Sequence, residues 1–405
     1  MTSPEEFPPL PDRARRPDPM NRRLRFGVIG CGYWGPHLVR NIHEIPQAEL
    51  VAISDLRQDR LDSLGVRYPG IRLLRDHQDL LAAGVDAVVV ASPIHTHHAL
   101  VREALLADKH VLVEKPLATS SAEAVELIAL ASRRQRVLMV GHTFVYNPAV
   151  QELARQVHAG ELGRIYYGDA ARLNLGQFQR HANVLWDLAP HDISILVHVL
   201  AQYPVQVSAR GSRCVQADVH DVCYLEILFS GGASAHVHVS WLDPDKVRRL
   251  TLVGDRRMAV FDDVEAATKL RIYDRGVEPS VAGGNGEPAL AYRNGEIVIP
   301  YIEWHEPLRV ECEHFVDCVR RGQRPLSDGE QGLIVVATLE AADRSLRSGG
   351  RLVPVEMPVL AAAGRSAAPW NANATHNGNG AHTNGNGAHP TDTRSSKTAQ
   401  VAGGA

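Results

Sequence analysis

Residues 26–35 read Phe-Gly-Val-Ile-Gly-Cys-Gly-Tyr-Trp-Gly, a short apolar run that ends in the pattern Gly30-x-Gly32-x-x-Gly35. The pattern predicts a strand over 24–29, a tight glycine turn and a helix over about 34–43. Gly30 suits the sharp turn, Gly32 leaves room for a pyrophosphate, and Gly35 lets the helix pack closely on the strand. The helix N-terminus offers free N–H groups and a positive dipole end to phosphates. We therefore predict a dinucleotide site, with a purely structural glycine turn as the alternative.

An acidic residue, Asp55, follows the next predicted strand. Its carboxylate is expected to accept hydrogen bonds from the adenosine ribose hydroxyls and to repel a 2′-phosphate, so NAD is favoured over NADP. Arg57, two residues on, would soften this preference. Other candidates to line the cofactor site, each with turn or packing roles as the alternative, lie in the glycine turn and near the ends of later strands: Cys31, Tyr33, Trp34, Ser92, Pro93, His97, Glu114, Lys115, Pro116 and His142.

Composition narrows the class of protein. The chain has 405 residues, 44% of them hydrophobic, and a formal net charge of −3, which does not favour nucleic acid or an anionic membrane as a partner. Its five cysteines are scattered, so neither a zinc site nor disulfides are predicted. No apolar run approaches 18 residues and the N-terminus lacks an apolar signal core. We expect a cytoplasmic enzyme without a metal site.

The chain divides into four predicted parts. Residues 1–21 are expected to be a disordered arm, and 359–405 a disordered low-complexity tail that repeats Asn-Gly-Asn-Gly-Ala-His. Over 22–145, strands alternate with helices, which predicts an α/β Rossmann domain with strand order 3-2-1-4-5-6. Its strands are predicted at 25–29, 49–54, 71–74, 86–91, 110–113 and 137–141.

The pattern changes over 146–358, where we predict a second α/β domain. Alternation such as His236-Val-His-Val-Ser-Trp indicates an open, mainly antiparallel sheet with one face covered by helices and the other free for a partner. His236 and His238 are expected on the surface. Strands are predicted at 164–174, 204–215, 220–229, 233–241, 247–254, 257–262 and 268–273, a short one at 296–300 after a loop, and one near 351–356. Helices are predicted near 148–159, 306–321 and 328–347.

A lysine follows the buried strand Val111-Leu-Val at Glu114-Lys115-Pro116. Open α/β sheets bind ligands at the carboxyl ends of their strands. Lys115 is therefore placed to hydrogen-bond a substrate hydroxyl and to stabilise a developing alkoxide. The alternative is a solvated lysine in a turn.

A third motif is Asp187-Leu-Ala-Pro190-His191, followed by apolar residues at helical spacing. Pro190 suits the first turn of a helix, which would put His191 near a helix N-terminus and keep its imidazole neutral. A neutral histidine can take a proton from a sugar hydroxyl, and Asp187 could orient its ring. The alternative is a capping aspartate beside an ordinary histidine.

Together these motifs resemble the glucose–fructose oxidoreductase / inositol dehydrogenase (Gfo/Idh/MocA) family over about residues 24–356. The resemblance implies that Lys115, Asp187 and His191 match the family's catalytic residues, with either the lysine or the histidine as base. It also implies a cis Lys115–Pro116 bond, an oxidoreductase acting on a CH–OH group with NAD, and a homodimer or homotetramer formed through the open sheet.

The segments Arg172-Leu-Asn174 and Asn183-Val-Leu-Trp186 resemble the subgroup that oxidises position 3 of UDP-N-acetylglucosamine-type sugars. We therefore expect hydride transfer at C3 of a nucleotide-linked sugar. Alternatives are an inositol or polyol dehydrogenase, a sugar 3-ketoreductase, or a regulatory protein that senses NAD(H). Many relatives in the wider family carry Gly-Gly where this chain has Leu185-Trp186, which reshapes the pocket. The candidate substrate residues are Asn147, Arg172, Asn174, Trp186 and His191. The candidates to meet a pyrophosphate, each with a solvated surface charge as the alternative, are Arg172, Arg180, Lys246 and Arg248.

Overall fold

The computed structural model describes residues 22–176, 178, 182–280 and 289–360. The predicted arm at 1–21 and residues 361–405 of the predicted tail lie outside the described residues. Among the described residues, no helix combines the length and apolar character needed to cross a membrane.

The N-terminal half forms a parallel six-stranded sheet in the order β3-β2-β1-β4-β5-β6, as predicted. Its strands are β1 (Leu24–Ile29), β2 (Ala48–Ser54), β3 (Arg72–Leu74), β4 (Ala87–Val90), β5 (His110–Glu114) and β6 (Leu138–Gly141). All four residues of β4 are buried, as expected of a central parallel strand covered on both faces. The order reverses at β1 and β4, and open α/β sheets bind ligands at the carboxyl ends of the strands beside such a reversal.

Helices connect these strands. They are α1 (Gly35–Glu44), α2 (Gln58–Arg67), α3 (His77–Leu81), α4 (His97–Leu106) and α5 (Ser121–Arg134), with the 3-10 turns η1 (Ile94–Thr96) and η2 (Thr143–Tyr146). Ser120 caps α5, because its Oγ accepts a hydrogen bond from the N–H of Glu123 at 3.2 Å.

The second sheet has nine strands in the order β14-β13-β12-β11-β7-β10-β9-β8-β15. They are β7 (Ile165–Leu175), β8 (Pro204–Ser212), β9 (Val222–Phe229), β10 (Ser234–Ser240), β11 (Leu242–Gly254), β12 (Met258–Asp262), β13 (Leu270–Ser280), β14 (Ala289–Val298) and β15 (Val353–Pro354). Only the pairing of β10 with β7 is parallel within this described sheet, so the prediction of a mainly antiparallel sheet is confirmed.

One face of the second sheet packs on helices. The helices of this half are α6 (Pro148–His158), α7 (Val184–Leu200), α8 (Pro307–Arg321) and α9 (Gly329–Arg347). A side chain built at Gly168 of β7 would meet Leu196 of α7 at 3.4 Å, which shows how closely the helix approaches the sheet. Along β10, Val237 and Val239 are buried while His236 is exposed, so the two faces alternate as predicted.

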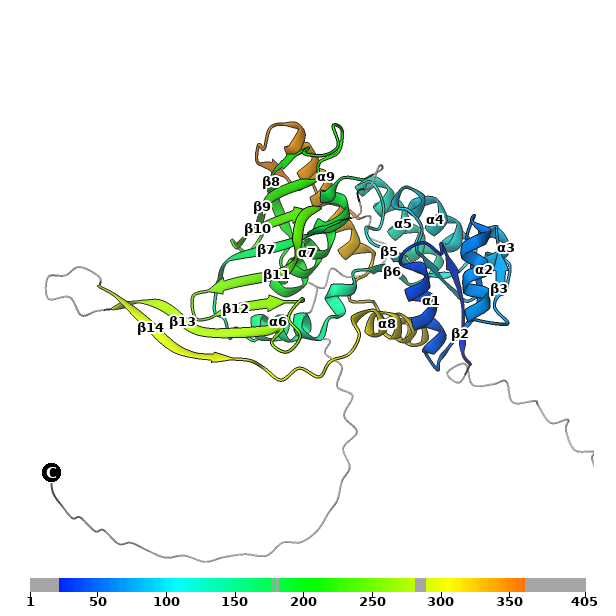
Figure 1. The fold of residues 1–405 in the computed structure, drawn as a ribbon, viewed down its shortest axis with the longest axis horizontal. Coiled ribbons are helices and arrows are strands. Elements are labelled where there is room, and N and C mark those ends of the chain that lie inside the picture. The colour runs from blue at the N-terminus through cyan, green and yellow to red at the C-terminus, as the bar shows by residue number, and fades with distance from the viewer. Residues whose placement is uncertain (1–21, 177, 179–181, 281–288, 361–405) are drawn as a thin grey trace, which may run out of the picture. The chain divides into compact units, whose positions relative to one another are not determined.

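The hairpin β13–β14 differs from the prediction. The sequence predicts a strand ending at 273, a loop and a short strand at 296–300. Instead both strands are long, and their pairing runs from Ile272 opposite Val298 to Ser280 opposite Ala289. Figure 1 shows this hairpin reaching past the other strands of the sheet. The Gly, Asn and Pro content of the segment is typical of loops, but backbone pairing in a two-stranded ribbon needs no particular side chains.

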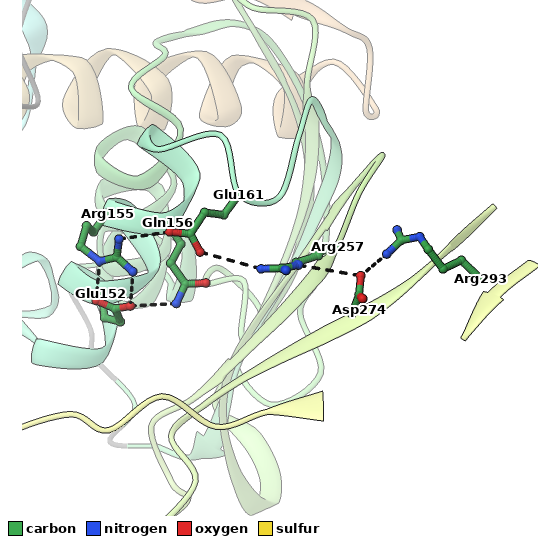
Figure 2. Close-up of polar contacts among 7 residues, drawn as sticks. All are labelled: Glu152, Arg155, Gln156, Glu161, Arg257, Asp274 and Arg293. Carbon is green, nitrogen blue, oxygen red and sulfur yellow. Dashed lines mark hydrogen bonds and ion pairs between the residues drawn. The ribbon is translucent and has the colours of Figure 1, made fainter. Parts of the chain in front are cut away.

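A chain of charged side chains ties α6 to the hairpin (Figure 2). Arg155 pairs with Glu161 at 3.1 Å, Glu161 lies 3.9 Å from Arg257, and Arg257 lies 3.8 Å from Asp274. Arg293 of β14 completes the series by bonding to Asp274. Because these pairs are solvent-accessible, each contributes at most about 1 kcal/mol, and the network orients the hairpin more than it stabilises the fold.

Candidate active site

The glycine turn has the geometry of a phosphate-binding loop. Gly30 has φ +95°, and a Cβ there would meet the backbone of Ala91 at 2.7 Å. A Cβ on Gly35 would collide with the carbonyl oxygen of Gly30, so α1 can pack this closely on β1 only with glycine. A Cβ on Gly32 would meet only Arg60 Nη1, at 3.7 Å, among the described residues, which leaves the space that a pyrophosphate needs.

The N-terminus of α1 is free of competing groups in the part of the chain that the structure describes. Its N-cap residue, Trp34, makes no side-chain cap, and its first turn holds no acidic residue. Tyr33 and Trp34 are exposed beside the turn with their rings 5.7 Å apart. The uncapped N–H groups and the helix dipole therefore suit an anionic phosphate, as the sequence predicts.

Asp55 lies directly beside the turn. One carboxylate oxygen accepts from the N–H of Cys31 at 2.7 Å, and the other from the N–H of Arg57 at 2.9 Å. Arg60 Nη1 lies 3.3 Å from Asp55 Oδ2, while the Arg57 guanidinium turns to Asp59 at 2.6 Å. Asp55 thus braces the glycine turn, a role that the sequence analysis did not foresee, and Arg57 is directed to another carboxylate.

Helix α7 starts earlier than predicted. Asn183 caps it, accepting from the N–H of Trp186 at 3.1 Å, so the expectation that Pro190 sits in the first turn was wrong. Pro190 lies inside the helix, where it lacks the N–H that would reach the Trp186 carbonyl. His191 therefore lies far from the helix N-terminus, and its protonation must have another cause than the helix dipole.

Lys115, Asp187 and His191 are brought together. Lys115 follows β5, and its Nζ donates to the backbone oxygen of Asp187 at 2.6 Å and lies 3.5 Å from Asp187 Oδ1. The other carboxylate oxygen of Asp187 accepts from Trp241 Nε1 at 3.0 Å. His191 is one helical turn beyond Asp187 and shares its face of α7. The Lys115–Pro116 bond is cis, as the resemblance implied.

Two histidines, the buried His142 and the partly buried His191, lie near this lysine. Burial, and then the charge of Lys115, lowers the pKa of His191 well below 6.5 and that of His142 to about 3. Both rings are therefore neutral near pH 7. His191 Nδ1 and both ring nitrogens of His142 are buried and have no hydrogen-bond partner among the described residues. Since buried polar atoms are normally paired, these nitrogens fit a site that a polar ligand completes.

Two carboxyl groups, those of Glu114 and Glu311, lie close enough to interact near the end of β5. Burial raises the pKa of Glu114 to about 7. Burial, and then the charge of Glu114, raises the pKa of Glu311 well above its usual value of 4.5. A Cβ on Gly141 would lie 3.3 Å from both the Glu114 Cα and Glu311 Oε1. Thr143 Oγ1 donates to Glu311 Oε2 at 2.7 Å. A side chain at 141 would therefore crowd both the Glu114 backbone and the Glu311 carboxyl group.

His97 links the loops that follow β4 and β5. One ring nitrogen lies 2.9 Å from the Ser92 carbonyl and the other 2.9 Å from the Pro116 carbonyl. The ring is buried, and a neutral imidazole can donate to only one of these oxygens. Thr96 Oγ1 also donates to Ser92 Oγ at 2.7 Å. Pro93 precedes η1 in the same loop.

Of the predicted substrate residues, Asn147 and Trp186 hydrogen-bond to other parts of the chain, and Asn174 lies near a strand end. Asn147 is fully buried: its Oδ1 caps α6 through the N–H of Ala149, and its Nδ2 donates to Asp263 at 3.2 Å. Trp186 donates its indole N–H to Asp343 of α9 at 3.0 Å. Asn174 is half-buried near the end of β7.

Arg172 forms a buried two-pronged ion pair with Asp192, at 2.8 and 2.9 Å. Its guanidinium lies 4.3 Å from the Phe144 ring centroid, and the His191 ring packs edge-on against that same ring at 5.2 Å. Arg172 and His191 thus pack on the same aromatic ring. Arg180, another basic residue that the sequence suggested for a substrate phosphate, lies outside the described residues.

Sequence reasoning missed Trp241 and Glu311. Alternation along β10 puts Trp241 on the same inward face as Val237 and Val239, so its inward direction was readable. Glu311 lies on the apolar face of α8 between Leu308 and Phe315, where a lone carboxylate is a signal of a special role. Their partners come from distant parts of the chain.

A parallel sheet with a glycine phosphate loop and a lysine–histidine pair at its carboxyl edge defines a dinucleotide-binding oxidoreductase. The profile of the oxidoreductase family with an NAD-binding Rossmann fold matches residues 24–142, and that of the GFO/IDH/MocA C-terminal domain matches 150–260. The chain belongs to the Gfo/Idh/MocA oxidoreductase family.

Similar proteins act on polyols and sugars. Inositol 2-dehydrogenase 1 of Saccharopolyspora erythraea is 36% identical over 350 residues, 82% of this chain and 96% of the relative. UDP-N-acetylglucosamine 3-dehydrogenase of Acidithiobacillus ferrooxidans is 29% identical over 325 residues, 78% of this chain and 94% of the relative. The crystal structure of GenD2 from gentamicin A biosynthesis, in complex with NAD, is 26% identical with a TM-score of 0.70, covering 83% of this chain and 97% of GenD2. The chain is thus a member of a family of NAD-binding sugar and polyol dehydrogenases.

Proposed function

We propose that this protein oxidises a secondary hydroxyl of a sugar, at C3 of a nucleotide-linked sugar, with NAD as the hydride acceptor. The carrying observation is the Lys115 ammonium, held 2.6 Å from the Asp187 carbonyl one helical turn from His191. The similarity to a UDP-N-acetylglucosamine 3-dehydrogenase supports the substrate class. Bound NAD would supply the hydride chemistry, held by the glycine turn, Asp55 and the N-terminus of α1.

Residues of this chain would accept the proton of the substrate hydroxyl and stabilise the charge on its oxygen. His191 is neutral, so it can accept the hydroxyl proton. Lys115 would polarise the substrate oxygen and stabilise the developing alkoxide, because its ammonium already lies in a largely buried place. Asp187 would hold Lys115 in position, and Trp241 would hold Asp187.

A turnover screen tests this function. The purified full chain is assayed for NADH formation with NAD and UDP-sugars, dTDP-sugars, free sugars and inositols, and for the reverse reaction with keto-sugars. We expect the highest kcat/KM with a nucleotide-linked sugar, and product analysis should place the ketone at C3. If no sugar or inositol supports NADH formation and no keto-sugar supports NADH consumption, the proposal is contradicted.

Inositol oxidation is a second candidate function. The S. erythraea inositol 2-dehydrogenase 1 has 36% identity with this chain, against 29% for the nucleotide-sugar enzyme. The same lysine and histidine would serve a ring hydroxyl of inositol equally well. A kcat/KM for myo-inositol above that for every nucleotide-linked sugar would favour this candidate.

We further propose that a homodimer or homotetramer forms through the open face of the second sheet. That face carries a hollow of about 420 Å³ over β7–β10, with Tyr224 stacked on His238 at 4.2 Å beside it. Tyr167 and Tyr224 are about half exposed there. Light scattering after gel filtration should report a multiple of the chain mass, and Tyr224→Asp should lower it. A monomeric wild-type protein would refute the assembly.

A further inference from the structure

Two arginines face each other across the inner side of the second sheet. Arg172 on β7 and Arg248 on β11 are direct cross-strand partners. Both guanidinium groups lie over the Phe144 ring, 4.3 and 5.7 Å from its centroid, and the His191 ring packs against the same ring. Like charges directly opposite each other destabilise a sheet, so this arrangement needs compensating anions.

The two arginines are neutralised unequally. Arg172 has a carboxylate to itself, because Asp192 meets it at 2.8 and 2.9 Å and both side chains are 4% exposed. Arg248 has a weaker contact, since only its Nη1 lies near Asp263, at 3.3 Å. The Arg248 side chain is 35% exposed, so the rest of its guanidinium remains open to a ligand.

Asp263 also faces a second cation. Lys269 Nζ donates to the backbone oxygen of Asp263 at 2.7 Å and lies 4.0 Å from its Oδ1. One carboxylate therefore serves two cations, and the three groups sum to +1. Burial, and then the charge of Arg172, lowers the pKa of Arg248, as expected for a cation without a full counter-charge. The site thus holds a surplus positive charge next to His191.

We propose that Arg248, with Lys269 beside it, binds an anionic group of the substrate and so selects charged sugars over neutral ones. This inference rests on the proposed function and narrows its substrate class. A carboxylate or a phosphate would supply the missing counter-charge, and an arginine fork pairs with either through charge-assisted hydrogen bonds. The anion is either a carboxylate on the sugar ring or the pyrophosphate of a nucleotide-linked sugar.

Binding of three sugars to the NAD-loaded full chain distinguishes a ring carboxylate from a pyrophosphate as the bound anion. The probes are D-glucuronate, UDP-N-acetylglucosamine and neutral N-acetylglucosamine, measured by titration calorimetry. We expect the wild type to prefer one of the two anionic sugars. Arg248→Gln should weaken that binding about 10- to 100-fold, the worth of a hydrogen bond to a charged group, and change N-acetylglucosamine binding by less than about twofold.

A matched control carries the same charge change on the other side of the sheet. Arg249 is the next residue of β11 and is exposed, so Arg249→Gln should leave the affinity for all three sugars within about twofold. Arg248→Lys keeps the charge and should recover part of the loss. If Arg248→Gln does not fold, as judged by its NAD affinity, Lys269→Met takes its place with the same expected loss of preference.

The possible failures are distinguishable. A wild type that binds N-acetylglucosamine at least as tightly as both anionic sugars overturns the inference, as does equal binding by the Arg248→Gln and Arg249→Gln variants. Neither binding result would contradict the proposed oxidation reaction itself. Conversely, absence of NADH formation with every sugar contradicts the proposed function, while the binding data still decide whether Arg248 selects an anion.

Discussion

Replacing Lys115 by methionine tests the proposed chemistry most directly. Methionine keeps the length and shape of the side chain but removes the ammonium that lies 2.6 Å from the Asp187 carbonyl. The Lys115 side chain is 10% exposed, so its charge acts in a medium far less polarisable than water. Loss of one such preorganised donor lowers kcat about 100- to 1,000-fold, which is about 2.7–4 kcal/mol of transition-state stabilisation.

The assay is steady-state NADH formation with the best sugar of the panel, together with a fluorescence titration of NAD. We expect the NAD affinity of Lys115→Met to change by less than about threefold, because the ammonium contacts α7 and not the glycine turn. Lys109→Met is the control, since Lys109 lies at the opposite end of β5. A kcat for Lys115→Met within about threefold of the wild type would refute the assigned role.

Three further predictions concern stability. The His191 ring stays neutral in the folded protein, whereas the unfolded chain gains a proton there as the pH drops below about 6.5, so stability falls with pH. Between pH 7.5 and 5.5, the free energy of unfolding of His191→Asn, measured by urea titration, should fall by about 1.4 kcal/mol less than that of the wild type. Asp192→Ala leaves Arg172 buried and unpaired, and its free energy of unfolding should fall by about 3–5 kcal/mol; a fall below 1 kcal/mol would show that the pair relaxes. Trp241→Phe removes the indole N–H from Asp187, and urea unfolding should report a loss of about 1.5–3 kcal/mol with unchanged NAD affinity.

The predictions that depended on short stretches of sequence were confirmed for the fold. The glycine turn, the alternation of strands and helices after it, and the mainly antiparallel second sheet all follow from local patterns. A turn needs glycine where φ is positive, and buried parallel strands need apolar runs. Where local composition misleads, as in the β13–β14 hairpin, backbone pairing with a distant segment overrides it.

Some features of the candidate site could also be predicted from short stretches of sequence, and others could not. The motifs around Lys115 and His191 each have an ordinary structural alternative, and they became candidates because they accompany a dinucleotide motif and resemble the motifs of a known family. The cause of the neutral imidazole was not visible, because it is burial near Lys115 and not the helix end predicted from Pro190. The Trp241–Asp187 contact was equally invisible.

The order of amino acids alone determined a Rossmann sheet, a phosphate loop and which lysine and histidine to examine, because each depends on residues a few positions apart. Only the folded chain decided that Lys115 contacts Asp187 of α7 and that Arg172 forms an ion pair with Asp192. It also decided that Arg248 shares the Asp263 carboxylate with Lys269. The physical reason is that charge balance in a partly buried site depends on which elements pack together, and that packing joins residues tens of positions apart.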